Sequence, residues 1–159
     1  MGVFRLSKGV AKVGDVRFDA GKLFAADGLS PLRVARATFD PTANTAQRPK
    51  AAYPIGPVIP NKAIIVGGLV QVNTIFTTAN ADAGLIALHV QGANDLISAI
   101  AVSNGTPWDA GMHDITPDLS TPAGGAIALT ADRMITATVT GEVLLGGKMT
   151  IFLFYLPGS

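Results

Sequence analysis

Alternation of side chains with a period of two constrains the fold of this chain more than any other feature. Residues 134–140 (MITATVT) place threonines between Ile135, Ala137 and Val139, so one face of the segment is apolar and the other is hydroxylated. Side chains alternate in this way across a β-strand and not around a helix. Segments 63–77, 85–91 and 126–130 also read as strands and are separated by turn residues. The pattern predicts an all-β fold, an antiparallel jelly roll or β-sandwich.

Three connections in this pattern deserve separate predictions. Gly67-Gly68 interrupts the first long strand and predicts a bend or bulge there. Residues 96–102 fit either a short helix capped by Asp95 or another strand. Residues 103–125 are rich in Gly, Pro, Asn, Asp and Thr and are expected to be irregular.

The last predicted strand, residues 149–156 (MTIFLFYL), is apolar on both faces. Such a strand has to be covered on both sides. We therefore expect this end of the chain to lie in a core or in a contact between subunits. The composition agrees, because 48% of the residues are hydrophobic and only 14% are charged. That balance excludes a disordered chain and favours an oligomer.

Charge divides the chain into two parts. Residues 1–62 carry ten basic and four acidic residues, a net +6, whereas residues 63–159 carry two basic and seven acidic residues, a net −5. Residues 1–54 include short, glycine-interrupted alternations and the linker-like segment 40–50 (DPTANTAQRPK). We expect an extended basic N-terminal arm over 1–54 and a sandwich domain over 55–159. The basic residues are spaced singly and lack an aromatic cluster, which favours an acidic protein surface over nucleic acid as their partner.

Catalytic and metal-binding patterns are weak in this sequence. It has no cysteine and two histidines, His89 and His113, which Asp109, Asp114 or Asp118 would have to join in a metal site. Their spacing matches neither HExxH nor a calcium loop, and no GxSxG is present. The sequence therefore predicts a protein that is not an enzyme and has no cofactor or metal.

Two further segments invite interpretation. Residues 141–149 (GEVLLGGKM) superficially look like a phosphate loop, but Glu142 and Met149 replace its glycine and hydroxyl residue and a strand follows, so we expect a hairpin connection. The longest apolar stretch, residues 63–72, has about half of the ~20 residues that a membrane helix needs. We predict neither a secretory signal nor a membrane partner.

Trp108 is the only tryptophan of the chain and lies in the irregular segment. It either plugs this loop onto the β core or offers a platform on which a sugar stacks. A lone tryptophan beside a β core usually buries its ring, which favours the plug.

The pattern of residues 94–108 (NDLISAIAVSNGTPW), followed by that of 126–156, resembles a group of tailed-bacteriophage decoration, or cement, proteins. The shared features are a segment rich in small residues, a Thr-Pro-Trp loop, a threonine-striped strand and a final aromatic strand. The resemblance covers roughly the last hundred residues and does not extend to residues 1–54.

This resemblance implies a jelly-roll protein, commonly a homotrimer, on the exterior of a virion. It would bind the major capsid protein, reinforce contacts between capsid subunits and have no catalytic role. The alternative is a receptor- or carbohydrate-binding jelly roll of a phage head fibre or tail, which would use Trp108 and the aspartate-rich loop. The residues that we expect at capsid or subunit contacts are Arg5, Lys8, Lys12, Arg17, Arg33, Arg36, Trp108, Phe152, Phe154 and Tyr155.

Overall fold

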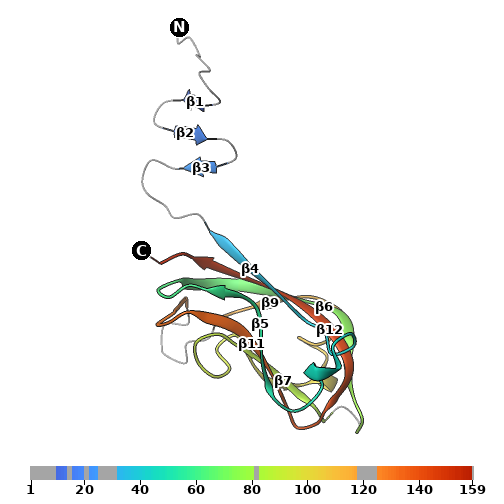
Figure 1. Ribbon diagram of the computed structural model, residues 1–159. Helices are drawn as coiled ribbons and strands as arrows, with labels where there is room; N and C mark the ends of the chain where they lie inside the picture. The colour runs from blue at the N-terminus through green and yellow to red at the C-terminus, as the bar shows by residue number, and fades with distance from the viewer. Residues whose placement is uncertain are drawn as a thin grey trace. The chain divides into compact units, whose positions relative to one another are not determined.

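Two antiparallel β-sheets pack face to face in the computed structural model of the protein (Figure 1). The structure describes residues 32–80, 83–117 and 125–158, and the strand backbones at 10–13, 16–19 and 22–24. The all-β sandwich expected from the alternation is thereby confirmed. Within the described residues, no helix is long and apolar enough to cross a membrane.

Each sheet of the sandwich is built from strands that are distant in sequence. The first has the order β10-β6-β12-β4, and β9 also pairs with β6. Its strands are β4 (Arg33–Phe39), β6 (Ile64–Thr78), β9 (Gly111–Ile115), β10 (Ile127–Ala128) and β12 (Leu144–Leu156). The second sheet has the order β5-β11-β7-β8. It consists of β5 (Ala52–Ile59), β7 (Leu85–His89), β8 (Ile97–Ala101) and β11 (Arg133–Thr140).

The strand pairs are nested. The outermost pair joins β4 to β12, the next joins β5 to β11, the next joins β6 to β9, and the innermost is β7 with β8. The pairs β6–β12 and β7–β11 then complete the two sheets. This nesting brings strands that are distant in sequence side by side in the two sheets of the sandwich.

The predicted alternation of β11 is confirmed by burial. Ile135, Ala137 and Val139 are at most 1% exposed and point into the core, whereas the threonines lie on the other side of the strand. The long β6 strand runs through Gly67-Gly68 without ending, and its register with β12 shifts beside Gly67, where Phe154 pairs with Gly67 but Tyr155 pairs with Ile65. The expected irregularity is therefore a bulge within one strand.

Two local predictions are resolved as strands. Residues 97–101 form β8 and not a helix, and a short 3-10 turn (Val102–Asn104) follows. The Asp95 carboxylate instead accepts backbone N–H groups of Val90, Gln91 and Gly92 at 2.7–2.9 Å and so closes the turn after β7. The segment expected to be irregular contains β9, and β12 begins at Leu144, within the predicted hairpin connection.

The compact sandwich unit begins earlier than the sequence suggested. It comprises Leu32–Ser159, and the preceding Met1–Pro31 forms a separate unit. The expected arm over 1–54 therefore includes β4 and the start of β5, which both belong to the sandwich. The physical reason is burial: Ala35, Ala37 and Phe39 of β4 are at most 2% exposed and pack in the core.

The N-terminal unit contains three short antiparallel strands in the order β1-β2-β3. They are β1 (Val10–Val13), β2 (Val16–Asp19) and β3 (Lys22–Phe24).

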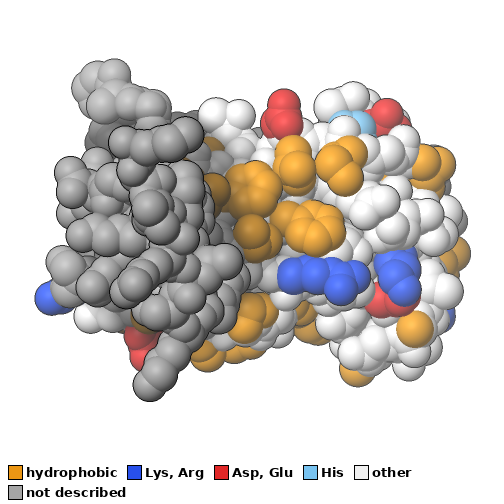
Figure 2. Space-filling model, turned by 90° about the horizontal axis from the view of Figure 1, so that it is seen from above, with side chains coloured by type: hydrophobic (Ala, Val, Ile, Leu, Met, Phe, Trp, Pro, Cys, Tyr) orange, Lys and Arg blue, Asp and Glu red, His pale blue; other side chains and the backbone are white. Residues whose placement is uncertain are grey.

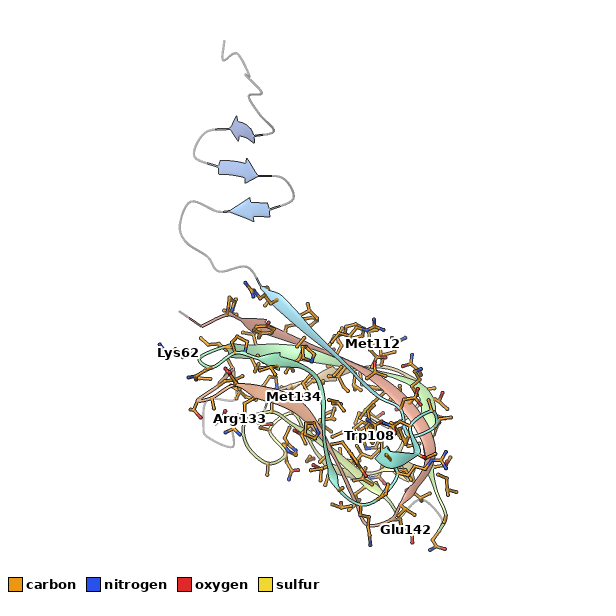
Figure 3. All side chains as sticks on the ribbon, viewed as in Figure 1. Lys62, Trp108, Met112, Arg133, Met134 and Glu142 are labelled. Carbon is orange, nitrogen blue, oxygen red and sulfur yellow. The ribbon has the colours of Figure 1, made fainter. Side chains whose placement is uncertain are left out.

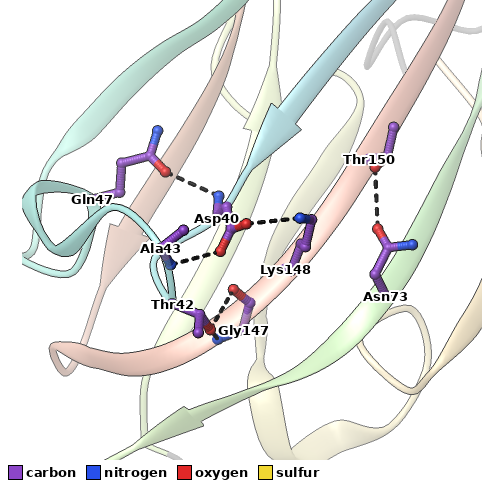
Figure 4. Close-up of polar contacts among 8 residues, drawn as sticks. All are labelled: Asp40, Thr42, Ala43, Gln47, Asn73, Gly147, Lys148 and Thr150. Carbon is purple, nitrogen blue, oxygen red and sulfur yellow. Dashed lines mark hydrogen bonds and ion pairs between the residues drawn. The ribbon is translucent and has the colours of Figure 1, made fainter.

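The segment 40–50, expected to be a linker, is a folded turn with a short 3-10 helix (Thr45–Gln47). Asp40 accepts the Ala43 N–H at 2.9 Å and pairs with Lys148 Nζ, also at 2.9 Å (Figure 4). Thr42 Oγ1 accepts the Gly147 N–H at 2.8 Å, which ties the turn to β12. The Ala43 N–H and the Lys148 ammonium hold the pKa of Asp40 below its ordinary value.

Candidate functional site

The side of the sheet β9-β6-β12-β4 that points away from the sandwich core is the candidate site, and we call it the outer face. Its residues follow from the strand register and lie in three rows across the sheet. They are Val34, Phe154 and Gly67 in the first row; Arg36, Phe152, Leu69 and Asp114 in the second; and Thr38, Thr150, Gln71 and Met112 in the third.

Hydrophobic side chains on the outer face remain accessible. Val34 is 53% and Met112 56% exposed, and Phe152, Phe154 and Leu69 are half-buried. The opposite side of the same β12 strand is fully covered, because Met149, Ile151 and Leu153 are each 0% exposed. The expectation that β12 is covered on both faces is thus met by the core on one side only, and the described chain leaves the other side partly open.

Charges flank this apolar centre. The Arg36 guanidinium carbon lies 5.9 Å from the Phe152 ring centroid, a cation–π contact at the edge strand β4. Asp114 lies at the other end of the same row, on β9. Figure 2 looks onto this face and shows hydrophobic side chains between basic side chains on one side and an acidic side chain on the other. The outer face therefore combines apolar area with two separated charges of opposite sign, which suits a protein partner.

The structure brings together three of the predicted contact residues. Arg36 is exposed on β4, and its cross-strand neighbour Phe152 and the nearby Phe154 present half-buried rings on β12. Arg33 is also exposed, but it pairs with Tyr155 and lies on the other side of β4 from Val34 and Arg36. The sequence did not mark Val34, Leu69, Met112 or Asp114 as members of this face. Their membership depends on the register of strands far apart in the chain, although the alternation of β4 contained part of the signal.

The remaining contact predictions fall elsewhere. Arg5 and Lys8 lie outside the described residues, and Lys12 and Arg17 belong to β1 and β2, whose side chains the structure does not describe. Tyr155 is 9% exposed and packs in the core, on the side of β12 opposite the outer face.

Trp108 is fully buried within the sandwich (Figure 3). Its ring meets Phe76 edge to face, with centroids 6.1 Å apart, and its Nε1–H donates to the Ile100 carbonyl at 3.1 Å. The plug interpretation is confirmed, since a ring with no exposed surface offers no stacking platform to a sugar. Because the Trp108 side chain has no exposed surface, it is not available for direct contact with a partner protein either.

The candidate metal ligands do not gather into a site. His89 lies on β7 of one sheet and His113 on β9 of the other. His113 Nε2 is 2.9 Å from the Asp109 carbonyl and 3.3 Å from its carboxylate, and Asp118 lies outside the described residues. No group of three potential ligands was found among the residues that the structure describes.

No family model and no curated protein matches this chain. Three solved structures share its fold. A chain from the acidic stable capsid structure of Helicobacter pylori bacteriophage KHP30 superposes with a TM-score of 0.55 at 13% identity, covering 82% of this chain and 90% of that one. A chain from the cyanophage Pam1 capsid asymmetric unit gives 0.54 at 18%, covering 88% and 97%.

The third, from the capsid of Ralstonia phage GP4, gives a TM-score of 0.55 at 18% identity and covers 84% of this chain and 88% of that chain. At these identities the likeness shows a common fold. It extends over 88–97% of each neighbour's chain.

Proposed function

We propose that this chain is a structural virion protein that binds the outside of a phage capsid and stabilises contacts between its major capsid subunits. The observation that carries the proposal is the likeness in fold to three chains from phage capsid structures over more than four fifths of this chain. The decoration, or cement, role and the homotrimer come from the sequence resemblance and belong to the same proposal.

The chemistry of the described surface supports binding by contact. The outer face exposes apolar side chains whose burial stabilises a complex by about 25 cal/mol per Å². Arg36 on this face supplies a charge that orients a partner and speeds its association. The N-terminal unit adds basic residues of its own, and we propose that it contacts the shell.

We also propose that the protein is not an enzyme. The two histidines, which are the residues best suited to acid–base work near neutral pH, lie on different sheets and have no shared site. The geometry instead offers a sheet face for another protein.

Co-sedimentation tests the proposal directly. The purified full chain is mixed with expanded capsids that lack it, pelleted, and compared with the same chain mixed with capsids of an unrelated phage. We expect saturable binding to the matching shell alone, and antibodies against the chain should then label intact particles. Absence of saturable binding, or labelling only after particles are opened, would contradict the proposed role or its exterior location.

A further inference from the structure

We propose that the outer face binds the same face of a second copy of this chain, about a two-fold axis that runs parallel to the strands between β12 and β6. The proposal starts from the uncovered side of β12, which the described chain leaves half-buried at Phe152 and Phe154. It does not depend on the proposed function, because it concerns contacts between copies in the absence of a capsid.

The charges of the central row select this arrangement. Arg36, Phe152, Leu69 and Asp114 are successive cross-strand neighbours, so the two charged ends are about 14 Å apart at the usual strand spacing. When two such faces meet, the two-fold axis lies in the plane between them. An axis parallel to the strands places each Arg36 opposite Asp114 of the second copy. An axis across the strands would place Arg36 opposite Arg36, which is repulsive.

The same axis also matches large side chains with small ones. In the first row, Phe154 lies opposite Gly67 of the second copy, and a Cβ built on Gly67 would meet no atom of its own chain within 4 Å. In the central row, Phe152 lies opposite Leu69 of the second copy. Bulk facing an open glycine lets two sheet faces approach and interlock, as the centre of a protein interface requires.

Two polar side chains on this side of β12 already have partners. Thr150 is already 5% exposed and its hydroxyl bonds to Asn73 Oδ1 at 3.1 Å (Figure 4). Lys148, which follows on the same side of β12, is paired with Asp40. When the face is covered, Thr150 and Lys148 therefore keep their partners. Arg36 and Asp114 each gain a partner of opposite charge on the second copy.

Exchange of the two charges tests the arrangement. The full chain and its variants R36E, D114R and R36E/D114R are followed by sedimentation velocity over a concentration series, without capsids. We expect a two-copy species for the natural chain, or a larger assembly with an even number of copies, such as six, if a three-fold contact exists elsewhere. Each single variant should weaken association at least tenfold, and the double variant should recover most of it.

A second pair of variants separates contact from folding. G67L projects a side chain into the open space, where its Cβ meets no atom of its own chain within 4 Å, and should abolish association at an unchanged melting temperature. A52L adds similar bulk at an exposed position on β5 of the other sheet and should leave association intact. A chain that stays monomeric, a mass that none of these variants alters, or a double variant no better than the singles would overturn the proposal. Capsid binding is scored separately, so its failure tests the proposed function and not this interface.

Discussion

Trp108 anchors an otherwise irregular loop through one ring. Its indole is enclosed between the sheets, contacts Phe76 and uses its only N–H on the Ile100 carbonyl. The residue combines a large apolar surface with a satisfied polar group, which is how buried tryptophans usually stabilise a fold. Its contribution is therefore structural.

Replacing Trp108 with alanine should lower the free energy of unfolding by about 3–5 kcal/mol, because it opens a large cavity. Trp108→Phe should lower the free energy of unfolding by less, because it keeps an aromatic ring. It still loses the hydrogen bond to Ile100. Chemical denaturation monitored by circular dichroism measures both. A loss below ~1 kcal/mol for the alanine variant would contradict the burial described.

Asp40 adds a pH dependence to stability. Its pKa is lowered in the folded chain, first by the Ala43 N–H and then by Lys148. A carboxyl whose folded pKa lies below its unfolded value of about 3.9 stabilises the fold above that pH, and this contribution is lost as the pH falls through the folded pKa. We expect Asp40→Asn to lose about 1 kcal/mol or less at pH 7, because the site is partly solvated.

The difference between the natural chain and Asp40→Asn should shrink as the pH falls below about 4. Lys148→Met is the matched control, because it removes only one of the groups that lower the pKa of Asp40 and should show a smaller effect with the same sign. A difference that is constant from pH 7 to pH 3 would show that the Asp40 charge does not stabilise the turn.

At the scale of elements, Gly147 at the start of the long β12 strand is under a steric constraint. Its φ is +132°, and a Cβ at this position would overlap the Phe76 ring. Gly147→Ala should therefore destabilise the fold by about 3 kcal/mol or prevent folding. Gly67→Ala, whose new methyl group meets nothing within 4 Å, should stay within about 0.5 kcal/mol of the natural chain. Equal thermal unfolding of the two variants would contradict this contrast.

The elements that the sequence predicted correctly are those with strong local patterns. The threonine stripe of β11 and the apolar strand β12 were recognisable because their side chains alternate or are continuously hydrophobic. β9 was missed since GMHDI contains only one β-branched residue and is held mainly by its pairing with β6. The outer face was only partly predictable, because its rows join β4, β12, β6 and β9 through long-range register.

The boundary of the sandwich was misjudged for a related reason. β4 carries Arg33 and Arg36 and is followed by a segment with two prolines and two threonines, which is typical of a solvated arm. Its alanines and Phe39 are nevertheless buried against β12 and the core. A small side chain such as alanine contributes little to a hydrophobic pattern, although it is what close packing of an edge strand requires.

For the whole molecule, truncation distinguishes the two units. Removing residues 1–31 should leave a sandwich that unfolds cooperatively, whereas removing 1–39 also deletes β4 and the buried Phe39, a loss of at least about 3 kcal/mol. Thermal unfolding by calorimetry separates these outcomes.

The shorter truncation also tests the role of the N-terminal unit. We expect it to weaken co-sedimentation with capsids while the sandwich stays folded. Unchanged binding would assign the basic residues of this unit another role.

The nested strand order has a consequence for how the protein is made. The turn after β4 closes onto the start of β12 through Thr42 and Gly147, which are 105 residues apart. β12 lies between β4 and β6, so the sheet has no central strand until the ribosome has added it. The β7–β8 hairpin forms early, but closing the outer pair costs the most loop entropy. We therefore expect the nascent chain to hold β4 and β6 apart until β12 has been synthesised, a period in which their unpaired edges need protection from aggregation.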